Sequence, residues 1–227
     1  MSSSVVGEEA PHRSEMSDAE PTTPRVLAVL SFMLERLVAR NDRLVVDCGQ
    51  NQFEGLSPSR RGLNVFHGIR APSISIPKYL ERIYKYTNCS PSCFVVGYVY
   101  IDRLLHKYPD SLVISLNVHR LLVTSVMVAS KVLDDVHYNN AFYARVGGVS
   151  NAELNRLELE LLFLLDFSVI VTSRIFETYC FHLEKEMIWS AIGQKIERVI
   201  VSSSVDDETE ISVEDTAKSS SPSQTIG

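Results

Sequence analysis

Two short stretches place charged side chains in otherwise apolar surroundings, and these residues are the first candidates for chemistry. In VASKVLDD, residues 128–135, an apolar run ends in Lys131, Asp134 and Asp135. In LNRLELELLFLLDF, residues 154–167, Glu158 stands among leucines. Carboxylates beside a lysine can serve as general acid and base. No nucleophile motif, phosphate-binding glycine loop or kinase signature accompanies them. We therefore expect no catalytic residues and no enzyme activity.

Glu158 is the more informative of these charges. At about 100° per residue, a helix places Glu158 inside an arc of leucines, whereas Glu160 falls on the polar side. The arc contains Leu154, Leu157, Leu161, Leu162, Leu164 and Leu165. A carboxylate among leucines is costly unless it is paired or meets a polar partner. Glu158 is thus expected to need a cation, and Lys131 is a candidate.

Lys131 also has a simpler interpretation. It shares the polar stripe of its own helix with Arg120, Thr124 and Asp135. A lysine in a last helical turn interacts favourably with the helix C-terminus, can pair with Asp135 at i+4, and can extend to water. The two aspartates are expected to end this helix. From the pattern alone, both interpretations of Lys131 stay open.

The cysteines give no sign of a metal or redox site. Cys48, Cys89, Cys93 and Cys180 form no CxxC pair and no repeat of metal-ligand spacing. In a reducing compartment they are most simply free thiols. We expect no metal and no cofactor.

Helical periodicity dominates the chain, and no alternation of strands and helices is present. Ser90 and Asn117 are candidate N-caps, and Ser150 with Glu153 forms a candidate capping box. The Gly pair in VGGVS, residues 146–150, fits a turn between helices. Helices are predicted at 24–42, 77–87, 90–108, 117–135, 150–165 and 173–187, with a possible last piece at 189–201. The predicted fold class is all-α.

The two ends of the chain differ from its body in composition. Residues 1–23 and 202–227 are polar and acidic and are predicted to be disordered, which leaves one domain at 24–201. The chain has a formal net charge of −6, but the body holds 17 acids and 20 bases, a net +3. This small excess favours a protein partner over nucleic acid. Without a signal-type start or an apolar span, we expect a soluble intracellular protein with no membrane partner.

Three motifs, in their order and spacing, resemble the cyclin box: YIDRLL at 100–105, VASKVLDD, and LNRLELELLFLLDF. The stretches SISIPKYLERIYKYTNCSPSCFVVGYVYIDRLL and NVHRLLVTSVMVASKVLDDVHYNNAFYARVGGVSNAELNRLELELLFLLDF are similar to the P-type or U-type plant cyclins, relatives of the fungal phosphate-starvation cyclin. The resemblance covers about residues 24–189.

The resemblance implies a single five-helix cyclin box, with its core at about 73–168, an N-terminal helix and one or two C-terminal helices. The helix from Val118 to Asp135 would be its centre. Cyclins bind a cyclin-dependent protein kinase and reposition its C helix so that the catalytic lysine and glutamate pair. In the family a lysine and a glutamate form the polar centre of that interface. They match Lys131 and Glu158, which are therefore the predicted partner-binding residues. A homo-oligomer is not expected.

Two departures from the family pattern limit what carries over. Too few residues follow Phe167 for the second five-helix repeat of ordinary cyclins, although single-box cyclins lack it too. In mitotic cyclins an arginine pairs with the aspartate that matches Asp102, and residues 73–78 offer none. The implied function is regulation of a kinase in cell-cycle, cell-division or nutrient-linked control, in the nucleus and cytoplasm. The alternative is a cyclin-fold module that binds nucleic acid or transcription factors.

One loop sequence matches a kinase consensus. SPSR at 57–60 has a Ser-Pro-x-Arg pattern, so Ser57 is a candidate phosphorylation site. An ordinary loop explains the same residues.

Overall fold

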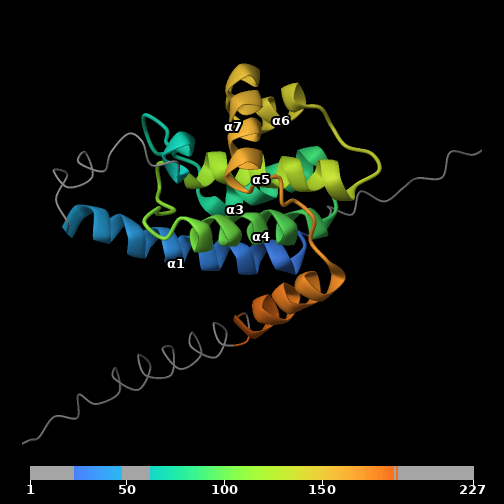
Figure 1. The fold of residues 1–227 in the computed structure, drawn as a ribbon, viewed down its shortest axis with the longest axis horizontal. Coiled ribbons are helices and arrows are strands. Elements are labelled where there is room, and N and C mark those ends of the chain that lie inside the picture. Colours follow the sequence, from blue (N-terminus) through green and yellow to red (C-terminus); the bar gives the residue numbers. More distant parts are fainter. Residues whose placement is uncertain (1–22, 48–61, 187, 189–227) are drawn as a thin grey trace, which may run out of the picture. The chain divides into compact units, whose positions relative to one another are not determined.

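A computed structural model describes residues 23–47, 62–186 and 188. By their contacts, residues 1–184 form one unit and residues 185–227 a second. The described residues of the first unit form helices joined by loops, with no strand among them (Figure 1). The prediction of an all-α fold is confirmed. None of the described helices combines the length and apolar character that crossing a bilayer requires.

Five helices form the box, and α5 is its centre (Figure 1). The helix α5 contacts α3, α4, α6, α7 and the short 3₁₀ helix η1. Every residue of α5 from Leu121 to Ser130 is buried. The bounds are Leu63–Phe66 for η1, Ile76–Thr87 for α3, Pro91–Lys107 for α4, Val118–Leu133 for α5, Asn140–Gly147 for α6 and Asn151–Leu164 for α7. The five-helix box and its predicted central helix are confirmed.

The burial of the middle of α5 adds to one prediction. Thr124, expected on the polar stripe of this helix, has no exposed surface. Its hydroxyl donates to the Arg120 carbonyl at 2.7 Å, so a buried polar group is satisfied within the helix. Beside it, Gly97 allows α4 to approach closely, because a Cβ there would lie 3.2 Å from Val126 Cγ2. Hydroxyls bonded within the helix and a missing side chain on α4 let neighbours cover α5 on all sides between Leu121 and Ser130.

The N-terminal helix α1, Arg25–Asp47, packs on α3 and α4 and is longer than predicted. The pattern ended it near Asp42, because the apolar repeat stops there. The structure shows polar contacts at the predicted end that hold this part of the helix against the segment before α5. Buried Asn41 donates to the Val113 carbonyl at 2.8 Å, and the Asp42 carboxylate accepts from the Ser115 amide and hydroxyl. Hydrophobic periodicity does not register such contacts.

The predicted caps lie at the starts of their helices, but two do not cap with their side chains. The Ser90 hydroxyl lies 3.3 Å from Cys93 Sγ, and the Asn117 side chain bonds the Leu112 carbonyl and the Ile114 amide. At α7 the Ser150 hydroxyl does accept from the Glu153 amide, at 3.1 Å. The Glu153 carboxylate, however, turns to another helix. Half of the predicted capping box therefore forms.

The remaining sequence predictions concern the turn before α7 and the chain after it. Gly148 ends α6 with φ 71°, a left-handed conformation that favours glycine, so the predicted turn in VGGVS is confirmed. Residues 173–186 are helical. The predicted tails, Cys48, Ser57 and the possible helix at 189–201 lie outside the described residues.

Candidate partner-binding site

The structure brings together the two residues singled out as a pair. Lys131, in the last turn of α5, donates from Nζ to Glu158 Oε1 of α7 at 2.5 Å. The side chains are 28% and 18% exposed, so the pair lies at the surface but is largely covered. Of the two partners considered for Lys131, the structure selects Glu158. The carboxylate among the leucines has the cation that burial requires.

A third polar residue completes the contacts of this carboxylate. The Asn140 amide, at the start of α6, donates from Nδ2 to Glu158 Oε2 at 2.6 Å and to Asn155 Oδ1 at 2.7 Å. Each oxygen of Glu158 thus has its own donor, one from α5 and one from α6. Sequence analysis missed Asn140. Its only signal was an asparagine pair opening a short helix, a pattern that capping explains by itself.

Exposed apolar side chains lie on the two helices of the pair and directly after α7. We call Val132, Leu133, Leu159, Phe163 and Phe167 the outer face; each is between 40% and 57% exposed. On α7, Glu158, Leu159 and Phe163 fall within about 140° of arc. The rings of Phe163 and Phe167 meet edge-on, with centroids 5.3 Å apart. Such an apolar surface around a polar contact is typical of a protein-binding site.

Two nearby acids, Asp134 and Glu160, take no part in this ion pair. Asp134 is the C-cap residue of α5, and its carboxylate accepts from the Ser90 amide and from the Cys93 thiol, both at 3.2 Å. Glu160 lies about 200° around α7 from Glu158. It is half-buried, which corrects the expectation of a simple solvent-facing residue. In the described part of the chain, no group of three or more His, Cys, Asp or Glu residues could hold a metal ion.

Comparison with known proteins identifies the family. The sequence profile described as Cyclin matches residues 24–169. The chain belongs to the cyclin family. It is 70% identical to Cyclin-U1-1 of Arabidopsis thaliana over 171 residues, which are 75% of this chain and 78% of that protein.

Two further relatives are also plant cyclins. Identity to Cyclin-U4-1 of Arabidopsis thaliana is 49% over 180 residues, covering 79% of this chain and 83% of that protein. Identity to Cyclin-P1-1 of Oryza sativa subsp. japonica is 50% over 161 residues, covering 70% and 61%. The similarity to plant U-type and P-type cyclins is confirmed. Membership of the cyclin family implies a regulatory role toward a cyclin-dependent kinase.

In this cyclin, Asp102 has a different partner from the arginine of the mitotic proteins. The Tyr179 hydroxyl donates to Asp102 Oδ2 at 2.5 Å, from the helix at residues 173–186. Burial and this bond to Asp102 raise the pKa of Tyr179. The neighbouring Arg103 donates to the carbonyls of Ser168 and Ile170 at 2.7 and 3.2 Å. The dipeptide in YIDRLL thus holds the chain that follows α7, a role that pattern alone did not reveal.

The described cysteines of this cyclin, Cys89, Cys93 and Cys180, are free thiols. Cys89 and Cys93 are buried side by side. Hydrogen bonding to Cys89, followed by burial, raises the pKa of Cys93, whereas the same bond lowers the pKa of Cys89. The expected free thiols are confirmed for these three residues.

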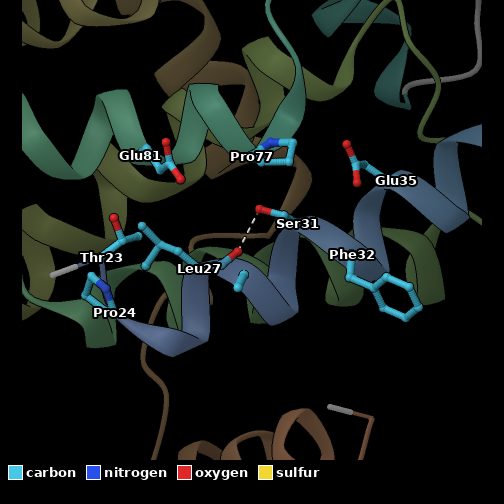
Figure 2. A pocket seen from close by; sticks show the side chains of 9 residues that line it. Thr23, Pro24, Leu27, Ser31, Phe32, Glu35, Pro77 and Glu81 are labelled. Carbon is cyan, nitrogen blue, oxygen red and sulfur yellow. Dashed lines mark hydrogen bonds between the residues drawn. The ribbon is translucent and has the colours of Figure 1, made fainter. Parts of the chain in front are cut away.

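A concavity of about 290 Å³ lies between the N-terminal halves of α1 and α3 (Figure 2). Its apolar wall includes Leu27, Phe32 and Pro77, and the carboxylates of Glu35 and Glu81 stand on either side. The Ser31 hydroxyl donates to the Leu27 carbonyl at 2.7 Å. Among these lining residues no nucleophile is hydrogen-bonded to a base.

Proposed function

We propose that this chain is the regulatory subunit of a cyclin-dependent serine/threonine protein kinase, acting in cell-cycle, cell-division or nutrient-linked control in the nucleus and cytoplasm. The chain would bind the kinase and stabilise its active conformation, in which the catalytic lysine and glutamate pair. The chemistry would belong to the kinase. Lys131 and Glu158 would form the polar centre of the interface.

The observation that carries this proposal is the Lys131–Glu158 pair beside the outer face. A lysine ammonium has three donors, and among the described residues one of them is assigned, to Glu158. The other two are available to carbonyl oxygens of a bound kinase. On α7 and directly after it, Leu159, Phe163 and Phe167 expose apolar surface that a helix of the kinase could cover. Cyclin-family membership makes a kinase the expected partner.

The proposal is tested by titrating a cyclin-dependent kinase with purified variants. Lys131→Ala and Glu158→Ala should each weaken binding by roughly 2 to 4 kcal/mol, the range for removing one member of a buried charge pair. The double variant should lose clearly less than the sum, because the two residues share one interaction. The wild-type chain should also raise kinase activity while showing none itself.

Glu160→Ala is the matched control, since it removes a carboxylate from the same helix on another face. Binding should change by about 0.5 kcal/mol or less. Because Glu160 is half-buried, thermal melts must first show that each variant is folded. Equal binding by folded Glu158→Ala and Glu160→Ala would mean that the kinase does not bind here.

A further inference from the structure

Asn140 contributes both N–H groups of its side-chain amide to the site. Its two N–H groups are used on Glu158 Oε2 and Asn155 Oδ1, at 2.6 and 2.7 Å. It is the first residue of α6, directly after the N-cap Asn139, so its backbone position is fixed by the start of that helix. Residues 140 and 158 thereby tie α6 to α7 at the point where α5 also joins.

The orientation of Lys131 depends on this arrangement. A partly exposed lysine–carboxylate pair contributes little by itself, because the long lysine side chain loses conformational entropy when it is held in place. Glu158 is the acceptor that positions the Lys131 ammonium. Because the Glu158 side chain can itself adopt several rotamers, it must be fixed before it can orient Lys131. With Asn140 on the second oxygen, the carboxylate plane is fixed from two sides. Lys131 is then directed before a partner arrives, which reduces the entropy lost on binding.

We propose that Asn140 is a positioning residue of the partner interface: it fixes the Glu158 carboxylate, and through it the direction of Lys131. This inference rests on the proposed function. It adds α6 to the interface as a support that need not touch the kinase. Kinase affinity should then depend on the bond between residues 140 and 158, not on Asn140 alone.

The sharpest variant is Asn140→Asp, which keeps the size of the side chain but replaces the donor by a carboxylate. Two carboxylates would then face each other beside one lysine, and their repulsion would turn Glu158 away. We expect kinase binding to weaken about tenfold or more. Asn139→Asp is the charge-matched control one residue away. Its oxygen caps α6 by accepting from the Phe142 amide, and aspartate caps as well as asparagine. It should bind within about twofold of the wild type.

Repeating Asn140→Asp in a Glu158→Gln background distinguishes a positioning role of Asn140 from a purely structural role in α6. There the carboxylate at position 140 can accept from the new amide, so Asn140→Asp should cost less than about threefold. Asn140→Ala, which removes both bonds without adding charge, covers the case in which Asn140→Asp fails to fold. Equal losses in the two backgrounds, equal losses for residues 139 and 140, or wild-type binding by folded Asn140→Ala would each overturn the proposal.

The bond itself can be followed in the free protein by NMR of the Asn140 side-chain amide. Glu158→Ala should shift that resonance, and Glu160→Ala should not. This readout needs no kinase, so it separates two failures. If the resonance shifts but Lys131→Ala and Glu158→Ala bind kinase normally, the proposed function is wrong. If those two variants lose binding while Asn140→Asp does not, only the role of Asn140 is wrong.

Discussion

Two ion pairs join α5 to α7, and they differ in their surroundings more than in their chemistry. At the N-terminal end of both helices, Arg120 Nε lies 2.8 Å from Glu153 Oε1, with side chains 25% and 28% exposed. We call this the inner pair. At the other end of α5, Lys131 and Glu158 form the outer pair at 2.5 Å, with similar exposure. Pair chemistry and exposure therefore do not show which one serves a partner.

The neighbours of each pair make the distinction. Arg120 packs against the segment before α3, where a Cβ on Gly68 would clash with its guanidinium, and Glu153 lies in the capped first turn of α7. The Glu153 carboxylate interacts favourably there with the dipole of the helix N-terminus. The outer pair has the exposed apolar residues of the outer face beside it. The inner pair is thus suited to hold the fold together, and the outer pair to meet another protein.

Exchanging the charges within each pair is the strongest way to break this comparison. Lys131→Glu with Glu158→Lys keeps an ion pair but moves the cation from α5 to α7. The ammonium then no longer lies at the position from which Lys131 is proposed to donate to the kinase. Binding should fall by more than about 100-fold, roughly 3 kcal/mol. Arg120→Glu with Glu153→Arg should bind within about threefold. It should change the unfolding free energy by less than about 0.5 kcal/mol, because both residues lie in first helical turns and the cation only moves from one helix N-terminus to the other. Calorimetry and thermal melts measure both quantities.

A reversed outcome, with binding lost only in the Arg120 and Glu153 exchange, would transfer the partner site to the other end of α5.

The outer face gives a second, smaller effect. Phe163→Ala should weaken kinase binding by about 1 to 3 kcal/mol, the usual cost of removing an aromatic anchor at an interface. Its effect on folding should be minor, since the ring is 54% exposed. Phe181→Ala is the matched control, because Phe181 is 65% exposed on the helix at residues 173–186. Equal losses for the two variants in a binding titration would show that exposure alone, not position, decides the effect.

The pH dependence of stability gives the smallest effect and concerns the inner end of α5. His119 is 8% exposed, and burial lowers its pKa. Below about pH 6.5 the unfolded chain takes up a proton there that the folded chain resists, so stability falls as the pH falls. His119→Gln can still donate to the Ile74 carbonyl, which lies 2.9 Å from Nε2. It should reduce the slope of unfolding free energy between pH 7 and 5 by less than about 1.4 kcal/mol per pH unit.

An unchanged slope in denaturant titrations of His119→Gln would assign the acid sensitivity elsewhere, for example to His67, whose pKa burial also lowers.

Much of the fold follows from the sequence, because helices that bury one face repeat their apolar residues at helical spacing. The pair of Lys131 and Glu158 was also predictable, since a carboxylate inside a leucine arc demands a cation. Periodicity failed where polar contacts decide. The bonds of Asn41 and Asp42 to the segment before α5, and the bond from Tyr179 to Asp102, join residues more than 70 positions apart. A pattern in one segment carries no record of such partners.

Exposed apolar residues were missed for a different reason. Leu159 and Phe163 are as hydrophobic as the buried leucines of α7, but a helical wheel places them outside the leucine arc. The missing step was to interpret these two apolar side chains, which lie off the buried face, as exposed apolar surface. Asn140 was missed because asparagine at a helix start already has an explanation as a cap. The predicted site therefore contained its two charges but lacked the apolar surface and the amide around them.

Adjacent residues of α4 hold both ends of the stretch from Ser168 to Tyr179. Arg103 binds the carbonyls of Ser168 and Ile170, and Asp102 accepts from Tyr179. The stretch is therefore a closed loop, and the conformational entropy lost on closing it is shared by the two contacts. Releasing either end returns that entropy and weakens the hold on the other. Residues 168–179 should thus open together in native-state hydrogen exchange, as one cooperative unit distinct from the helices of the box.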